Sequence, residues 1–251
     1  MRKNILLLLI STLYYSQLSP KVNHLYQELS KSKRVESKNI GDGGRESEVY
    51  KTHIKIGKIA TNKELEYIAF NGNTITKKYI SNILFYRKSK LVVDIFKEYL
   101  KSNDSVKMLS GCVGYDSFLP NEIYKDVVSE KGRINDSEWY KKWKDSLVHN
   151  KKELDSFDLN LIEMMKVETP WEMKEINSLI HSFDQIALDY KESPQNIIDL
   201  ICSYHLFENV KVPYYEKIIF FETKYNSKYI KEYMEFCRYG IRKETENSDS
   251  D

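Results

Sequence analysis

The chain of 251 residues contains three cysteines, and the most reactive setting surrounds Cys112. Small residues flank it in Ser110-Gly111-Cys112-Val113-Gly114, a spacing that permits the strained elbow on which a hydrolase nucleophile is presented. A thiol becomes that nucleophile when a neighbouring base lowers its pKa. Cys112 is therefore the catalytic candidate of a thiol hydrolase. The alternative interpretation is a glycine-containing turn between helices that holds a buried thiol.

A second constellation could bind a metal. Cys202 and His205 are three residues apart on a predicted helix, so they face the same side, and Cys237 or His181 could complete a zinc site. The chain has no paired C-x-x-C and no HExxH, GxxxxGK[ST] or GxGxxG motif. These absences favour a protein without a metal or cofactor, in which the three cysteines act as small apolar residues. At most one disulfide can form among them.

Trp139 and Trp143 are the candidates for binding. They are four residues apart, which places them on one face of a helix. Such a pair either anchors the core or forms an exposed aromatic site for a protein partner.

The composition narrows the class of protein. The net charge is only +2 although 30% of the residues are charged, which argues against a dedicated nucleic-acid binder. An aromatic content of 13% is too high for a disordered chain. Nine glycines are few for an α/β fold rich in tight turns and phosphate loops. The composition therefore favours helices joined by short connections.

The first nineteen residues have the layout of a signal peptide. Arg2 and Lys3 precede an apolar run that begins at Ile5 and continues to Tyr15. We expect this leader, residues 1–19, to be cleaved, which leaves a secreted protein without a membrane span. The alternatives are a hydrophobic N-terminal helix buried in a cytoplasmic protein and an uncleaved anchor.

Beyond the leader, residues 20–48 are polar and contain few apolar side chains, so they are expected to be a flexible linker. A helical domain is expected over residues 49–240, followed by a disordered acidic tail at residues 241–251. Tyr50, Thr52, Ile54 and Ile56 alternate with polar residues, as in a single strand.

The fold class expected is all-α, an irregular bundle of about seven helices without an extensive sheet. Apolar residues at helical spacing predict helices near residues 61–71, 75–100, 120–132, 169–190, 194–206 and 213–240. The longest helix is expected near residues 137–167, because apolar residues follow an almost heptad spacing from Trp139 to Met165.

The order of leader, basic polar linker and helical domain resembles exported proteins of intracellular parasites, such as the Plasmodium helical interspersed subtelomeric family. The stretch from Lys63 to Leu100 has a similar rhythm. That family's export motif has the form Arg-x-Leu-x-Glu/Gln/Asp, and Arg34-Val35-Glu36-Ser37 lacks its leucine. No residue role is carried over from the resemblance.

These patterns favour a secreted or exported helical protein that acts by protein–protein interaction and not as an enzyme. The first alternative is an intracellular helical factor within a larger assembly such as a ribonucleoprotein, with the N-terminal run buried. The second alternative is a thiol hydrolase that uses Cys112.

Overall fold

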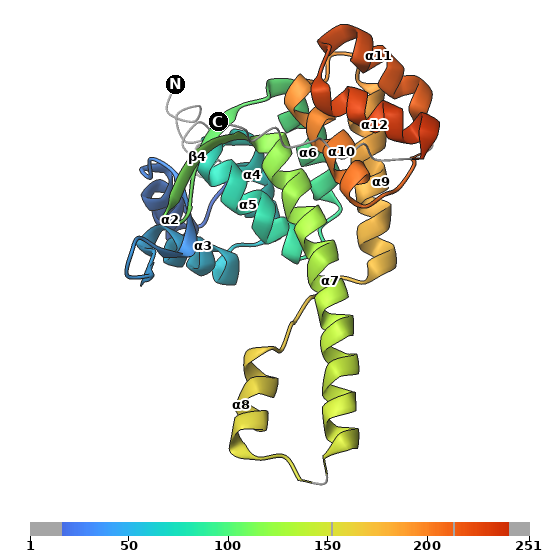
Figure 1. The fold of residues 1–251 in the computed structure, drawn as a ribbon. Helices are drawn as coiled ribbons and strands as arrows, with labels where there is room; N and C mark the ends of the chain where they lie inside the picture. The colour runs from blue at the N-terminus through green and yellow to red at the C-terminus, as the bar shows by residue number, and fades with distance from the viewer. Residues whose placement is uncertain (1–16, 152, 213, 241–251) are drawn as a thin grey trace, which may run out of the picture. The chain divides into compact units, whose positions relative to one another are not determined.

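The computed structural model describes residues 17–151, 153–212 and 214–240. Two compact units are present (Figure 1): an N-terminal unit that runs to Tyr99 and includes Asp104–Asp126, and a C-terminal unit of Leu100–Asn103 and the residues from Val127 onward. The described residues form eleven helices and a four-stranded mixed sheet. The chain is mostly helical, but the expectation of about seven helices and no extensive sheet is wrong. The expected leader and tail lie largely or wholly outside the described residues.

The N-terminal unit holds every strand that the structure describes. Its elements are α2 (Pro20–Ser30), β1 (Val35–Ile40), β2 (Arg45–Glu46), α3 (Glu48–Ile59), α4 (Asn62–Asn71), α5 (Thr74–Tyr86), most of α6 (Leu91–Ser102), β3 (Ser105–Gly111), β4 (Val113–Phe118) and the first turns of α7 (Leu119–Asn150).

Residues 20–48 are not a linker, because they form α2, β1 and β2. Val22 and Leu29 are buried on one side of α2, and Val35 and Ile40 are buried at the two ends of β1. Four widely spaced apolar residues suffice here because the remainder of the unit supplies the core against which they pack. The sequence did hold a signal for α2, because Val22, Leu25, Tyr26 and Leu29 follow the i, i+3, i+4, i+7 spacing of a helix face.

The sheet has the order β2-β1-β3-β4, in which β1 and β3 run parallel and the outer pairs run antiparallel. β3 and β4 form a hairpin in which Ser110 pairs with Val113. Gly111 in its turn has a φ of +57°, a backbone conformation that glycine adopts without strain. The hairpin was not expected because only Val106 and Ser117 of its two strands are buried, so the alternation is faint.

The predicted strand at residues 50–56 is also wrong, since these residues belong to α3. The Ser47 hydroxyl accepts a hydrogen bond from the Tyr50 amide at 3.0 Å and caps the helix. His53, Ile56 and Ala60 are buried, at spacings of three and four residues. The spacing of the buried side chains is therefore that of a helix, although apolar and polar residues alternate in the sequence as in a strand.

The predicted short helix that ends at Asn71-Gly72 is confirmed as α4. Thr61 and Glu64 form a capping box at its start. Glu64 also accepts a hydrogen bond from the Ser19 amide at 2.8 Å, which ties the start of α2 to α4. Burial by itself raises the pKa of Glu64, but the hydrogen bonds from Thr61 and Ser19 outweigh it and lower the pKa to about 2.

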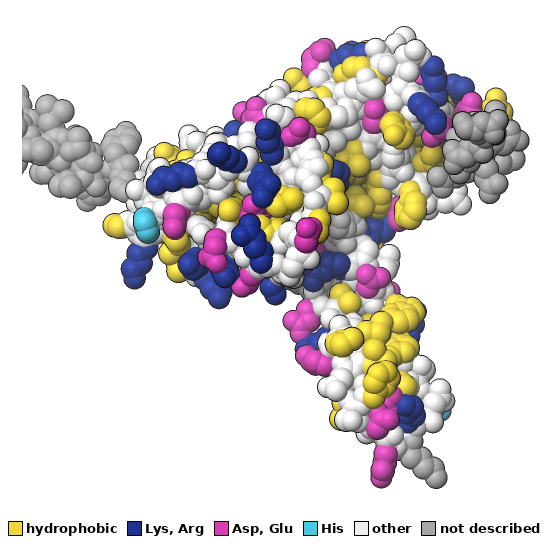
Figure 2. Space-filling view, turned by 60° about the vertical axis from the view of Figure 1, so that its left-hand side comes forward, with side chains coloured by type: hydrophobic (Ala, Val, Ile, Leu, Met, Phe, Trp, Pro, Cys, Tyr) yellow, Lys and Arg dark blue, Asp and Glu magenta, His cyan; other side chains and the backbone are white. Residues whose placement is uncertain are grey.

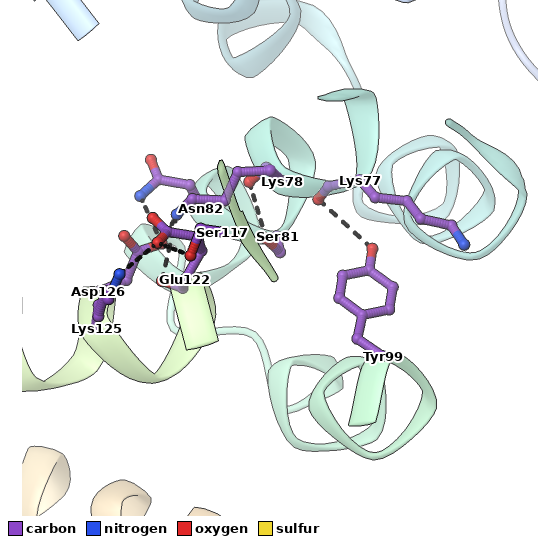
Figure 3. Close-up of polar contacts among 9 residues, drawn as sticks. All are labelled: Lys77, Lys78, Ser81, Asn82, Tyr99, Ser117, Glu122, Lys125 and Asp126. Atoms are coloured by element: carbon purple, nitrogen blue, oxygen red, sulfur yellow. Dashed lines mark hydrogen bonds and ion pairs between the residues drawn. The ribbon is translucent and has the colours of Figure 1, made fainter. Parts of the chain in front are cut away.

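A polar cluster joins α5 to β4 and to the first turns of α7 (Figure 3). The buried Lys78 ammonium lies 2.5 Å from the Asp126 carboxylate. This carboxylate also accepts a hydrogen bond from the side-chain amide of Asn82 at 3.1 Å. The Ser117 hydroxyl donates to Glu122 at 2.6 Å. An ammonium removed from water is costly unless a carboxylate balances it, so Asp126 is required wherever Lys78 is buried.

Asp126→Ala should lower the free energy of unfolding by about 3 kcal/mol, because it leaves the Lys78 ammonium buried without its carboxylate. The double substitution Lys78→Met with Asp126→Leu should recover most of that loss, since no buried charge remains. Urea unfolding followed by circular dichroism measures both. If the single and double variants lose equal stability, the ion pair is not what holds this cluster together.

Asp94→Ala provides the matched control. Asp94 also pairs with a lysine, Lys97, at 3.7 Å, but both side chains are exposed. Its removal should change the free energy of unfolding by less than about 0.5 kcal/mol.

His53 is a buried histidine whose ring stacks on Tyr79 with centroids 4.6 Å apart. Its Nδ1 has no hydrogen-bond partner among the described residues. Burial, with a smaller effect of the Lys78 charge, lowers the pKa of His53 to about 4. Because an unfolded imidazole has a pKa of about 6.5, the neutral ring contributes fully to stability above that pH, and the contribution is lost as the pH falls towards 4.

His53→Phe keeps the stacked ring and removes the titration. Between pH 7 and pH 4.5 the wild type should lose about 2 kcal/mol more of its free energy of unfolding than the variant does. Urea unfolding at the two pH values measures the difference. An identical loss in both proteins would show that protonation of His53 is not resisted by the fold.

The C-terminal unit contains the remainder of α7 and five further described helices: α8 (Ser156–Met164), α9 (Met173–Asp189), α10 (Gln195–Phe207), α11 (Tyr215–Tyr225) and α12 (Lys228–Tyr239). Its core is formed by fully buried side chains of α9 to α12, among them Phe183, Ile201, Phe221 and Tyr233. The helix predicted over residues 213–240 is divided in two at Asn226, which has a φ of +49°.

The predicted long helix near residues 137–167 is wrong at both ends. α7 begins at Leu119, passes through Gly132 without a break and ends at Asn150. A single glycine inside a helix costs only about 1 kcal/mol, which long-range packing overrides. The chain then turns, and a capping box of Asp155 and Asp158 starts α8. None of the helices formed by the described residues has the length and apolar character needed to cross a bilayer.

Candidate interaction surface

The distal part of α7 and the whole of α8 form a helical hairpin, which we call the α7–α8 hairpin and define as residues 137–151 and 153–165. Two contacts close it. The buried Tyr140 hydroxyl donates to the Ile162 carbonyl at 3.0 Å, and the Lys151 ammonium contacts both carboxylate oxygens of Asp158 at 2.5 Å. The hydrogen bond from Lys151 lowers the pKa of Asp158, so the ion pair persists at neutral pH.

Large apolar side chains of the hairpin are exposed on both helices. The exposed fraction is 54% for Trp139 on α7, and 70% for Phe157 and 79% for Met164 on α8. Leu159, Val148 and Met165 are also exposed, but Val148 lies on the opposite face of α7 from Trp139, and Leu159 on the opposite face of α8 from Phe157. Figure 2 shows hydrophobic side chains, in yellow, gathered on one face of the hairpin. Large exposed apolar surfaces often mark interaction sites, because the free energy falls when a partner removes them from water.

The two tryptophans predicted to bind lie side by side. The rings of Trp139 and Trp143 are stacked with centroids 6.0 Å apart and planes 9° from parallel. Trp143 is half-buried, whereas Trp139 faces solvent. The structure therefore places one member of the pair on the exposed patch and leaves the other as its support.

The sequence pattern did not single out Phe157, Leu159 and Met164, because the heptad interpretation assigned Phe157 to a buried seam. One signal was present in α8. Its sequence, Ser-Phe-Asp-Leu-Asn-Leu-Ile-Glu-Met, has apolar residues around most of its circumference. A short helix of that composition cannot hide every apolar side chain against a single neighbouring helix.

The catalytic candidate Cys112 lies at the turn between β3 and β4 and is exposed. This turn joins two strands, whereas the hydrolase elbow leads from a strand into a helix. No histidine or carboxylate among the described residues is hydrogen-bonded to Cys112. The surroundings of the thiol therefore lack the base that nucleophilic activation needs.

The three residues considered as metal ligands have other roles. His205 Nε2 lies 2.8 Å from Asp184, and both side chains are buried. Cys202 is buried in α10, and burial raises the pKa of its thiol, which keeps it protonated. Cys237 is half-buried on α12, where burial also raises its pKa. Within the described ranges no three His, Cys, Asp or Glu side chains are grouped to hold a metal ion.

A cavity of about 330 Å³ in the C-terminal unit borders the His205–Asp184 pair. The Lys131 ammonium in its wall contacts Glu208 and lies 2.9 Å from the Tyr204 hydroxyl. His181, the other histidine considered as a ligand, is hydrogen-bonded to Tyr214. The charged groups of this cavity are thus paired with one another, and their arrangement does not indicate the charge of a ligand.

Iodoacetamide at neutral pH should modify Cys112 first, Cys237 more slowly and Cys202 only after unfolding. Exposure makes Cys112 accessible, whereas burial both shields the other two thiols and raises their pKa. A time course by intact mass and peptide mapping measures the order. Rapid modification of Cys202 in the native protein would contradict its placement in the core.

Comparisons with known proteins do not supply a relative. No family model matches the chain, and no curated protein and no solved structure shows significant similarity to it. The exposed apolar patch of the α7–α8 hairpin is thus the feature with the clearest physical consequence.

Proposed function

We propose that this chain acts by binding another protein through the apolar patch of the α7–α8 hairpin. One observation carries the proposal: Trp139, Phe157 and Met164, from both helices, are each more than half exposed. Covering a side chain of this size stabilises a complex by about 1.5–3 kcal/mol relative to leaving it in water. Tryptophan is also among the residues that most often dominate binding energy.

The shape of the patch suggests how a partner binds. Its two sides are helices of one hairpin, so an amphipathic helix of the partner can pack along them with apolar residues spaced by three and four. Methionine suits such a surface because its flexible side chain adapts to the packing of the partner. The occupant proposed is therefore an apolar helix face on a different protein.

The place of action is part of the same proposal. The positively charged start and apolar run of the first nineteen residues support a secreted or exported protein, whose partner is then outside the cytosol. In the intracellular alternative that run is buried in an assembly. Binding is favoured over thiol hydrolysis because Cys112 lies on a strand-to-strand turn without a hydrogen-bonded base.

Phe157→Ser should weaken partner binding by about 30-fold, which corresponds to a lost hot spot of about 2 kcal/mol. Partners are identified by quantitative co-purification from the native source, and the affinity of the purified pair is then measured by calorimetry. The substitution is exposed, so it should leave the free energy of unfolding within about 0.5 kcal/mol of the wild type.

Phe207→Ser is the matched control. Phe207 is 78% exposed, as prominent as Phe157, but it lies at the end of α10, outside the hairpin. This variant should bind the partner as the wild type does. Equal losses in both variants would contradict a role for the hairpin. A Phe157-dependent dimer of the chain with itself, seen by light scattering without any other protein, would replace the proposed partner by a second copy.

A further inference from the structure

A second surface of distinct chemistry lies in the N-terminal unit, on α2, β1 and α3. Two adjoining hollows of about 350 Å³ and 420 Å³ are present there, and Lys55 and Lys58 line both of them. We call the two hollows together the lysine groove. The lysines that line it are Lys21, Lys38, Lys51, Lys55 and Lys58, and His24 also lines the first hollow. Figure 2 shows Lys and Arg side chains, in dark blue, gathered over this unit.

The lysine groove carries an excess of positive charge, although Glu46 also lines it and the charge of Glu48 acts on Lys55. Lys51 contacts Glu46 at 3.3 Å and Glu48 at 2.8 Å, so its charge is compensated. In the part of the chain that the structure describes, the other four lysines make no ion pair. The whole chain has a net charge of only +2, so these four charges are a local concentration and not a reflection of a basic protein.

Helix α3 holds three of these lysines close to one another. Lys51, Lys55 and Lys58 follow one another on α3 at spacings of four and three, which places them on one face of the helix. Like charges at these spacings repel and cost helix stability. The unfavourable arrangement is relieved when an anionic group lies between the ammonium groups.

The groove also has an apolar component. Leu25 and Ile54 line it as half-buried side chains, and Ile59 at its edge is 47% exposed. A free phosphate or a nucleic-acid backbone makes no favourable contact with aliphatic groups. The two rings that line the hollows are His24, which is exposed, and Tyr50, which is half-buried with its ring against His53, whereas successive stacked bases need several exposed rings. Lysines around aliphatic side chains in a groove match a peptide that contains both acidic and aliphatic residues.

We propose that the lysine groove binds an acidic peptide segment of a protein partner, with Asp or Glu side chains at the lysines and Leu, Ile or Val side chains against Leu25 and Ile59. This site is in the other unit from the α7–α8 hairpin, and it rests on different residues. Because four cations take part, the affinity should fall steeply as salt is added.

The test uses the full chain and a fluorescent peptide of about eight residues that alternates Glu or Asp with Leu, followed by fluorescence anisotropy. Lys55→Glu with Lys58→Glu changes the two lysines that line both hollows and should weaken binding at least 10-fold. The control, Lys228→Glu with Lys231→Glu, makes the same charge change at the same spacing on two exposed lysines of α12, outside both the lysine groove and the α7–α8 hairpin, and should bind as the wild type does.

Two further peptides test the acidic and the aliphatic contacts separately. Replacing Glu and Asp by Gln and Asn should abolish binding, and replacing Leu by Ala should weaken it several-fold. Ile59→Ser should reduce the affinity for the Leu peptide but not for the Ala peptide. An equal affinity for the Leu and Ala peptides would overturn the proposal, because it would reduce the groove to a non-specific cation patch.

Other classes of ligand are distinguished in the same assay format. Vesicles containing anionic phospholipid and a single-stranded oligonucleotide are titrated against the wild type and the Lys55→Glu, Lys58→Glu variant. Tighter binding of either ligand than of the peptide, lost in that variant, would assign the groove to lipid or nucleic acid and overturn the peptide proposal. Failure of the wild type to bind the peptide at about 1 mM would also overturn it.

Discussion

The N-terminal unit is organised around the need to balance one buried ammonium. Lys78 points from α5 into the protein, and the carboxylate that balances it is Asp126 on α7. β4 ends at Phe118 and α7 begins at the next residue, so the first turns of α7 are held where Asp126 meets Lys78. Since α7 then continues unbroken to Asn150, the same constraint governs the start of the helix that carries the tryptophans of the hairpin.

Local signals in the sequence predicted local structure, and pairings between distant residues were not foreseen. The capping pair Thr61 and Glu64 marks the start of α4 because both partners are within one turn. The sheet depends on β1 meeting β3, and little in either strand records that pairing, since most of their side chains are exposed or half-buried. The predicted long helix ends early, at Asn150, because the heptad spacing of the sequence continues into α8 while the helical backbone does not.

The candidate surfaces were foreseen in part. Trp139 and Trp143 were predicted from their spacing, but the exposure of Phe157 depends on where the chain reverses, which spacing does not determine. The net charge of +2 is a sum over the whole chain and does not show how the charges are distributed, so it gave no indication of the lysine groove. If the strand predicted at residues 50–56 had extended to Lys58, Lys55 and Lys58 would have been on opposite faces, whereas helix α3 brings them together.

The contacts that close the α7–α8 hairpin join residues much nearer in the sequence than those that join β1 to β3, and this difference affects the order of folding. The α7–α8 hairpin is closed by the bond between Tyr140 and Ile162, which are 22 residues apart. β1 and β3 are joined by contacts such as that of Ser37 with Gly111, which are 74 residues apart. The entropy lost on closing a loop grows with its length, and topologies rich in distant contacts fold more slowly. When the complete chain refolds, the hairpin with its apolar side chains should therefore form before the sheet, so a binding surface exists while the other unit is still incomplete.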